Sequence, residues 1–270
     1  MKRTVCLLLL LCLLPLGALA EEEEFIDEEI ADEAEETLEL GGEDDMGLDE
    51  EDDYMAYWVE YDYKELTVGN PTPLTGKFFT GLWGGTTSDN DVQELLHSYN
   101  LVKWDPDLGH IRFDHHVVSG AVITDDAKGN RTYYLALQED LKYSDETPIT
   151  AWDYAFSLLL QIDPVIAELE GVPMDTPWLK GIDEYLAQEI VDEEHPRVLS
   201  GLRVLSDYNM TFTIKAEALP YFYELARLAL KPYPISVIAP DTEVKDDGNG
   251  VYFSRPLEAE QLRKTILDPQ

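Results

Sequence analysis

The stretch that decides the fold runs from Thr132 to Pro164 and reads TYYLALQEDLKYSDETPITAWDYAFSLLLQIDP. In its first part, Tyr133, Leu135 and Leu137 occupy every second position, and this alternation is typical of a half-buried strand. Residues 144–148, SDETP, are polar turn formers followed by a proline, so they end the strand in a tight turn. We therefore expect a strand and a turn over the first half of this stretch.

A buried helix is expected directly after the turn. Thr150 and Asp153 have the spacing of a capping box, which contributes about 1 kcal/mol to the start of a helix. Apolar residues then recur at the spacing of one helix face, namely Trp152, Ala155, Phe156, Leu159 and Leu160. Such a face needs a core to pack against, so strand, turn and helix together indicate a piece of an α/β domain.

The run LKYSDETPITAWDYAFSLL resembles the signature of bacterial extracellular solute-binding proteins of family 5, the oligopeptide- and dipeptide-binding components of ABC importers. The matching positions are Lys142, Ser144, Asp145, Thr147, Pro148, Thr150, Ala151, Asp153 and Ser157. Glu146 departs from the pattern, because the family usually has glycine there, a residue that adopts positive φ without steric cost. We expect the turn at Glu146 to be either strained or built differently.

A second block, residues 201–234, resembles the same family. It predicts a strand at 204–205, a strand over 210–214, and a helix that starts at Leu219 with proline in its first turn and ends before Pro232. In the family, a strand pair and a Leu-Pro-x-Phe helix in this order carry the chain back into the first lobe.

The sequence predicts several further elements. They are short strands at 57–61 and 66–69, a helix capped by Ser88 and Asp91 with an apolar stripe of Val92, Leu95, Leu96 and Tyr99, a hairpin of 117–123 with the strand at Thr132, and a helix over 178–190.

The first 20 residues have the features of a secretory signal peptide. Two basic residues precede an apolar run over 5–14, and an Ala-Leu-Ala pattern ends at Ala20. We expect cleavage there and secretion across the cytoplasmic membrane, to a periplasm or a cell surface. The cysteines, Cys6 and Cys12, both lie in this segment, so the mature chain has no disulfide, thiolate metal site or cysteine nucleophile.

Acidic residues dominate the rest of the chain, which has a formal net charge of −37. Residues 21–53 contain 20 acidic residues and no basic one, and we expect a disordered acidic linker there. A charge of this sign excludes nucleic acid as a partner.

The resemblance implies an α/β fold of the periplasmic-binding-protein type (type II, cluster C). Residues 54–270 would form a partial solute-binding domain, with a first lobe made of a mixed sheet flanked by helices and an inserted subdomain at about 90–195. Family members are longer, so we expect this domain to be truncated at its C-terminus and the second lobe to be absent.

The function that the resemblance implies is non-catalytic: an extracytoplasmic component of an ABC importer captures a peptide or another small solute and delivers it to the membrane permease. We expect a monomer without cofactor or metal. Ligand contacts are expected from Asn70 and Thr72, which follow the first strand, and aromatic walls from Trp83 and Phe156. Backbone near the first strand would pair with an extended peptide.

Two alternatives stay open on the sequence alone, a secreted hydrolase that uses paired carboxylates and an acidic, calcium-dependent surface scaffold. The sequence has no Gly-x-Ser-x-Gly and no His-Glu-x-x-His, which argues against the commoner hydrolase sites. His115 and His116 are adjacent, and on a strand they would point to opposite faces, so they predict no metal site. Enzymatic turnover, or a calcium-dependent rise in melting temperature, would distinguish these classes.

Overall fold

The computed structural model describes residues 69, 71–76, 78–188 and 192–268. The predicted signal peptide (1–20), the acidic linker (21–53) and the strand at 57–61 lie outside these residues, as does most of the strand predicted at 66–69. All described residues belong to one compact unit, Thr67–Gln270.

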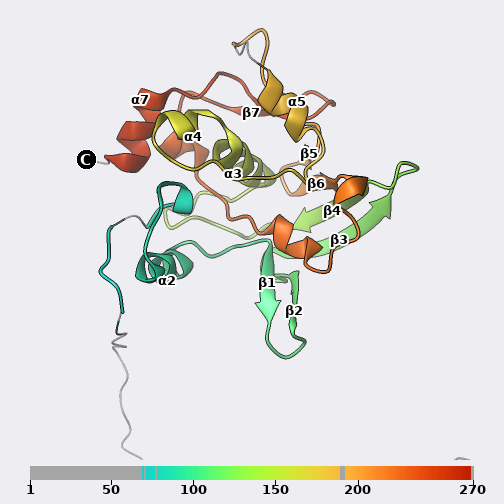
Figure 1. Ribbon diagram of the computed structural model, residues 1–270, viewed down its shortest axis with the longest axis horizontal. Helices are drawn as coiled ribbons and strands as arrows, with labels where there is room; N and C mark the ends of the chain where they lie inside the picture. The colour runs from blue at the N-terminus through green and yellow to red at the C-terminus, as the bar shows by residue number, and fades with distance from the viewer. Residues whose placement is uncertain (1–68, 70, 77, 189–191, 269–270) are drawn as a thin grey trace, which may run out of the picture. The chain divides into compact units, whose positions relative to one another are not determined.

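The described elements are short and numerous (Figure 1). In chain order they are η1 (Gly81–Trp83), α2 (Thr87–Leu96), β1 (Val102–Asp105), β2 (His110–Phe113), β3 (Val118–Asp125), β4 (Arg131–Leu137), α3 (Ala151–Ile162), α4 (Val165–Glu168), α5 (Ile182–Ala187), β5 (Leu202–Ser206), β6 (Asn209–Ile214), η2 (Ala216–Ala218), η3 (Glu224–Leu228), α6 (Ile235–Ile238), β7 (Val244–Asp246), β8 (Val251–Phe253), α7 (Ala259–Leu262) and η4 (Arg263–Leu267). None of the helices in this part of the chain has the length and apolarity of a membrane span.

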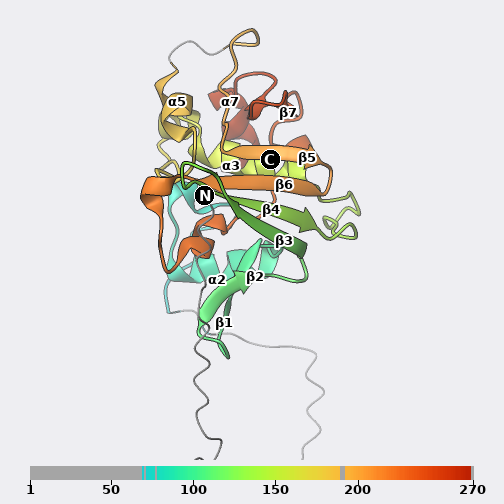
Figure 2. The ribbon, with the colours of Figure 1, turned by 90° about the vertical axis from the view of Figure 1, so that its right-hand side faces the viewer.

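The central sheet has four strands in the order β3-β4-β6-β5 (Figure 2). Together with the helices packed on it, this sheet confirms the α/β class. A mixed sheet was expected, but every described strand pair is antiparallel. Within the hairpins this follows from the connections: five residues join β3 to β4 and two join β5 to β6, and such short links permit only antiparallel neighbours.

The predicted strand and helix both form and meet in the core. Tyr133, Leu135 and Leu137 of β4 are buried, while Tyr134 between them is 43% exposed. Helix α3 packs against β5, α4, β7 and β8, so it is buried on almost all sides instead of along one stripe (Figure 1). Trp152, at the margin, is half-buried and donates its Nε1–H to Asp207 at 3.0 Å.

One hydroxyl inside α3 ties the helix to a distant segment. The Ser157 Oγ donates to the carbonyl oxygen of Asp153 at 2.8 Å and accepts the backbone N–H of Tyr233 at 2.7 Å. Ser157 is fully buried, so both bonds form away from water. Ser157, the last matching position of the motif, thus satisfies a buried amide that is 76 residues away in sequence.

The cap of helix α2 lies two residues before the predicted cap. Its capping box is Thr86 with Asp89, not Ser88 with Asp91. The sequence TTSDND contains both spacings, but the Asp89 carboxylate also accepts the backbone N–H and the hydroxyl of Thr75, each at 2.8 Å. This tertiary contact selects the earlier cap.

Two other predicted helices are shorter than expected. The helix predicted over 178–190 is restricted to Ile182–Ala187 in the described residues. The helix predicted from Leu219 is replaced by the 3-10 helix η3, which starts at Glu224, because Leu219, the residue before the proline, has an extended backbone.

The turn before α3 confirms the expectation for Glu146. Its φ is +67°, in the left-handed region that glycine adopts easily and other residues avoid. The Lys142 ammonium lies 3.0 Å from the Glu146 carboxylate, so a surface ion pair spans the turn.

Candidate functional site

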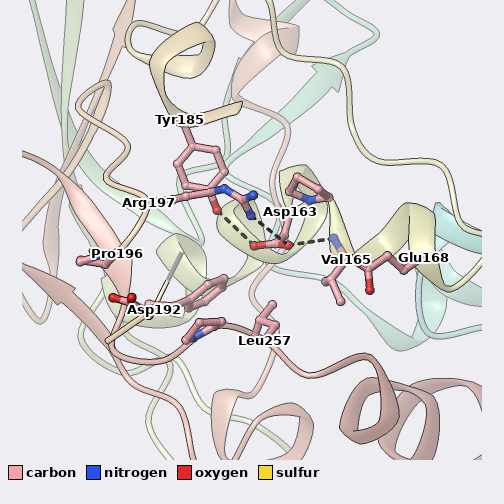
Figure 3. Close-up of a pocket in the computed structure, with 11 residues that line it drawn as sticks. Asp163, Val165, Glu168, Tyr185, Asp192, Pro196, Arg197 and Leu257 are labelled. Carbon is pink, nitrogen blue, oxygen red and sulfur yellow. Dashed lines mark hydrogen bonds and ion pairs between the residues drawn. The ribbon is translucent and has the colours of Figure 1, made fainter. Parts of the chain in front are cut away.

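A cavity of about 170 Å³ opens at the C-terminal end of α3 (Figure 3). Its walls come from the α3–α4 junction at 163–168, from Tyr185 of α5, from 192–197, and from 253–257, which begins with the last residue of β8. Segments from three distant parts of the chain therefore meet around it.

Asp163 is the most buried charged group of this cavity, with a side chain that is 10% exposed. It follows α3 directly, and its Oδ1 accepts the backbone N–H of Val165 at 2.9 Å, which starts α4. The Tyr185 hydroxyl donates to Oδ2 at 3.4 Å, and the Arg197 Nη1 lies 4.0 Å from Oδ1 (Figure 3). Backbone, phenol and guanidinium together hold the carboxylate in place.

Burial controls the protonation of this cluster. It raises the pKa of the Asp163 carboxyl group, although the Val165 amide and the Arg197 charge act in the opposite direction. Burial also raises the pKa of the Tyr185 phenol well above its ordinary value, and the nearby Asp163 charge adds to this effect. Tyr185 therefore stays a hydrogen-bond donor at neutral pH.

Arg197 has polar atoms beyond those of its ion pair. Its Nη2 donates to the carbonyl oxygen of Gln188 at 3.3 Å, whereas its Nε is buried and has no hydrogen-bond partner within the described part of the chain. The other charged lining residues, Asp163, Glu168 and Asp192, are all acidic. This surplus of negative charge favours neutral or cationic polar groups over anions.

The described residues form no group of three or more His, Cys, Asp or Glu side chains that could hold a metal ion. His115 and His116, expected on a strand, lie exposed in the turn before β3.

The predicted ligand contacts lie in different places. Thr72 shares a hydrogen bond of 2.8 Å with Ser88 at the start of α2. Trp83 is half-buried and donates its Nε1–H to the carbonyl oxygen of Leu169 at 2.8 Å. Phe156 is fully buried, with its ring 5.8 Å from that of Phe253 in the cavity wall. Asn70 lies outside the described residues, and a ligand role for all four stays a prediction.

The sequence interpretation did not single out Asp163, Tyr185 or Arg197. A signal was available for Asp163: an acidic residue at the C-terminal end of an apolar helix opposes the helix dipole and needs a compensating partner. Nothing local pointed to Tyr185 and Arg197 as those partners, because they lie 22 and 34 residues further along the chain.

Comparisons with known proteins give a partial match. No family model matches the chain. The chain is 30% identical over 112 residues to the periplasmic oligopeptide-binding protein OppA of Escherichia coli (strain K12), and 29% identical over 112 residues to OppA of Salmonella typhimurium (strain LT2). The resemblance to family 5 solute-binding proteins is confirmed over part of the chain. The match spans about a fifth of the length of these relatives and 42% and 41% of this chain.

Solved structures of the same kind are similar to this chain. The periplasmic oligopeptide-binding protein OppAIV of Borrelia burgdorferi has a TM-score of 0.44 and 18% identity, and the match covers 62% of this chain and 34% of that one. Haemophilus influenzae OppA, in complex with the peptide RPPGFSPFR, has a TM-score of 0.44 and 18% identity, with 66% and 36% of the two chains covered.

Proposed function

We propose that this chain is a non-catalytic, extracytoplasmic solute-binding component of an ABC importer, and that its solute is an oligopeptide. The observation that carries the proposal is the 30% identity over 112 residues to a protein named for binding oligopeptides in the periplasm. A membrane permease is then the partner to which the peptide is delivered, and the binding protein acts as a monomer.

The structure gives the matched motif a supporting role. Thr150 and Asp153 cap α3, and Ser157 ties that helix to Tyr233, so these residues position the core. The peptide is then bound by other side chains near this helix. We assign this binding to Asn70, Thr72 and Trp83, to Phe156 as the residue that backs the cavity wall at Phe253, and to the cavity at Asp163, whose carboxylate and guanidinium groups suit the polar groups of a peptide backbone.

Isothermal titration of the 270-residue chain with defined peptides of three to five residues tests the proposal. We expect a saturable heat with at least one peptide. Thr72→Val, which keeps the size and removes the hydroxyl, should weaken that binding several-fold. Thr87→Val is the matched control, because Thr87 is an exposed residue of the same region. Absence of heat with every peptide would refute the proposed function.

A further inference from the structure

The turn between β7 and β8 contains an asparagine followed by a glycine, Asn249 and Gly250. Asn249 is exposed, whereas Gly250 is buried. A Cβ atom at Gly250 would lie 2.4 Å from the carbonyl oxygen of Leu199 and 2.9 Å from the Cα of Ser200. Because both of these are backbone atoms of a packed segment, the turn requires glycine at this position.

An Asn-Gly pair brings together two groups that react with each other. The backbone nitrogen of the second residue can bond to the Cγ of the asparagine and close a five-membered ring. A side chain on the second residue would hinder this attack, and glycine has none. The turn therefore places an unhindered nucleophile, the Gly250 nitrogen, next to the carboxamide of Asn249.

The attacking nitrogen distinguishes Asn249 from the other described asparagines. In residues 78–188 and 192–268, the backbone N–H of Gly250 donates no hydrogen bond. The residues that follow the other asparagines are held in a helix, a strand or a backbone hydrogen bond, namely Asp91, Leu101, Arg131 and Met210. Those amides must leave their elements before they can attack, and the Gly250 amide need not.

The carboxamide of Asn249 lies beside one carboxylate of the same turn. The Asp247 Oδ1 accepts the backbone N–H of Asn249 at 2.9 Å, and Oδ2 accepts a hydrogen bond of 3.4 Å from Asn249 Nδ2. A carboxylate can accept the N–H groups of an amide and equally those of ammonia. Asp247 therefore orients the nitrogen that would leave in the reaction.

We propose that Asn249 is a site of spontaneous deamidation, a covalent modification that needs water and no enzyme. The Gly250 nitrogen gives up its proton and bonds to the Cγ of Asn249. The bond from Cγ to Nδ2 then breaks, and Nδ2 takes up a proton and leaves as ammonia. One water molecule opens the cyclic imide at either carbonyl group, which yields aspartate or isoaspartate. This inference does not depend on the proposed function.

The modified turn is the one that covers the edge strand β5 of the central sheet. Asp246, at the end of β7, accepts the backbone N–H of Val204 at 2.9 Å and the Nε–H of Arg203 at 2.8 Å. Asp246 also pairs with Val251, the first residue of β8. Isoaspartate at position 249 adds a methylene group to the backbone of this short turn and a charge beside two carboxylates. We expect it to weaken the contact of β7 and β8 with β5.

The test is incubation of the fresh 270-residue chain at 37 °C, at neutral and at mildly alkaline pH, followed by peptide mapping with mass spectrometry. We expect Asn249 to acquire the mass increase of an amide converted to an acid about tenfold or more faster than Asn90, Asn100, Asn130 and Asn209, whose attacking amides are held. The rate at Asn249 should rise with pH, because the attacking nitrogen must lose its proton. Equal rates at all five asparagines would overturn the proposal.

A synthetic peptide of residues 244–253 shows whether the folded turn permits the reaction. We expect Asn249 in the folded chain to react within about tenfold of its rate in the peptide, since no helix or sheet must open first. A slower reaction in the folded chain would overturn the proposal.

Two variants link the modification to its effect. Asn249→Gln keeps the carboxamide but would have to close a larger ring, so it should stop the reaction in this turn. Asn209→Gln is the matched control in the exposed β5–β6 turn, and it should leave the rate at Asn249 unchanged. After incubation the unaltered chain should contain isoaspartate and melt at a lower temperature, whereas Asn249→Gln should melt as before. An unchanged melting temperature of the isoaspartate form would overturn the effect assigned to the turn.

Discussion

Helices α2 and α3 begin with the same capping box, Thr86 with Asp89 and Thr150 with Asp153, and yet the two aspartates differ in charge behaviour. The Thr86 amide, followed by the amide and hydroxyl of Thr75 and the Thr86 hydroxyl, lowers the pKa of Asp89 to about 2, although burial opposes them. Burial raises the pKa of Asp153, although the Thr150 amide and hydroxyl also bind it. The same motif starts both helices, but the surroundings of its aspartate decide what the charge of that aspartate contributes.

The two helices also differ in what they bury. In α3 nine residues are buried and most of them are apolar, whereas in α2 the buried residues are Ser88 and Asp89. Leu95 and Leu96 of α2 face solvent. Apolar packing therefore holds α3, and hydrogen bonds at its first turn hold α2.

The largest expected difference comes from truncating one leucine in each helix. Leu159→Ala in α3 removes a fully buried side chain and should lower the free energy of unfolding by about 2–5 kcal/mol. Leu95→Ala in α2, where the side chain is 83% exposed, should change it by less than about 0.5 kcal/mol. Urea unfolding followed by circular dichroism measures the free energy of unfolding of both variants. Equal losses of this free energy would show that the apolar side chains of α2 are packed in solution.

The two capping aspartates should respond to pH in opposite directions. Because the folded-state pKa of Asp89 is below its ordinary value of 3.8, its stabilisation is present above that value and is lost as the pH falls toward 2. The advantage of the unaltered chain over Asp89→Asn should therefore shrink between pH 5 and pH 2.5.

For Asp153 the stability should depend on pH in the opposite direction. Its folded-state pKa is raised, so its favourable contribution is complete below 3.8 and is lost as the pH rises through the folded-state value. Relative to Asp153→Asn, the unaltered chain should gain stability as the pH falls. Urea midpoints of the three proteins at pH 5, 4, 3 and 2.5 provide the measurement, and parallel curves would contradict the contrast.

A smaller effect is expected in the turns that lead into the helices. The chain enters α2 through Gly84 with φ of +74°, but it enters α3 through Glu146 with φ of +67°. Glu146→Gly should relieve steric strain and raise the free energy of unfolding by up to about 1 kcal/mol, less the extra entropy of the unfolded chain. Glu146→Ala is the control, since it loses the exposed ion pair to Lys142 and keeps the strain. A higher melting temperature for Glu146→Ala than for Glu146→Gly would show that the turn is not strained.

The parts of the fold that could be predicted are those set by neighbouring residues. Alternation at Tyr133, Leu135 and Leu137 predicted β4, the Thr150 box predicted the start of α3, and the missing glycine predicted the unusual turn at Glu146. Each of these signals lies within a few residues of the feature that it predicts.

The parts that could not be predicted depend on distant contacts. The cap of α2 is chosen by Thr75, 14 residues before Asp89. The cavity needs Asp163, Tyr185 and Arg197 brought together by loops whose paths leave no periodic pattern. Local sequence offers two caps for α2 and no partner for Asp163, so only tertiary structure resolves either case.

The hydroxyl of Ser157 has a consequence for natural variation in α3. Judged by helix propensity and hydropathy, alanine is the better residue at this apolar position. Alanine would nevertheless leave the backbone N–H of Tyr233 buried without an acceptor. The substitution that looks most harmless in an aligned sequence would therefore remove the hydrogen bond between α3 and the segment at Tyr233.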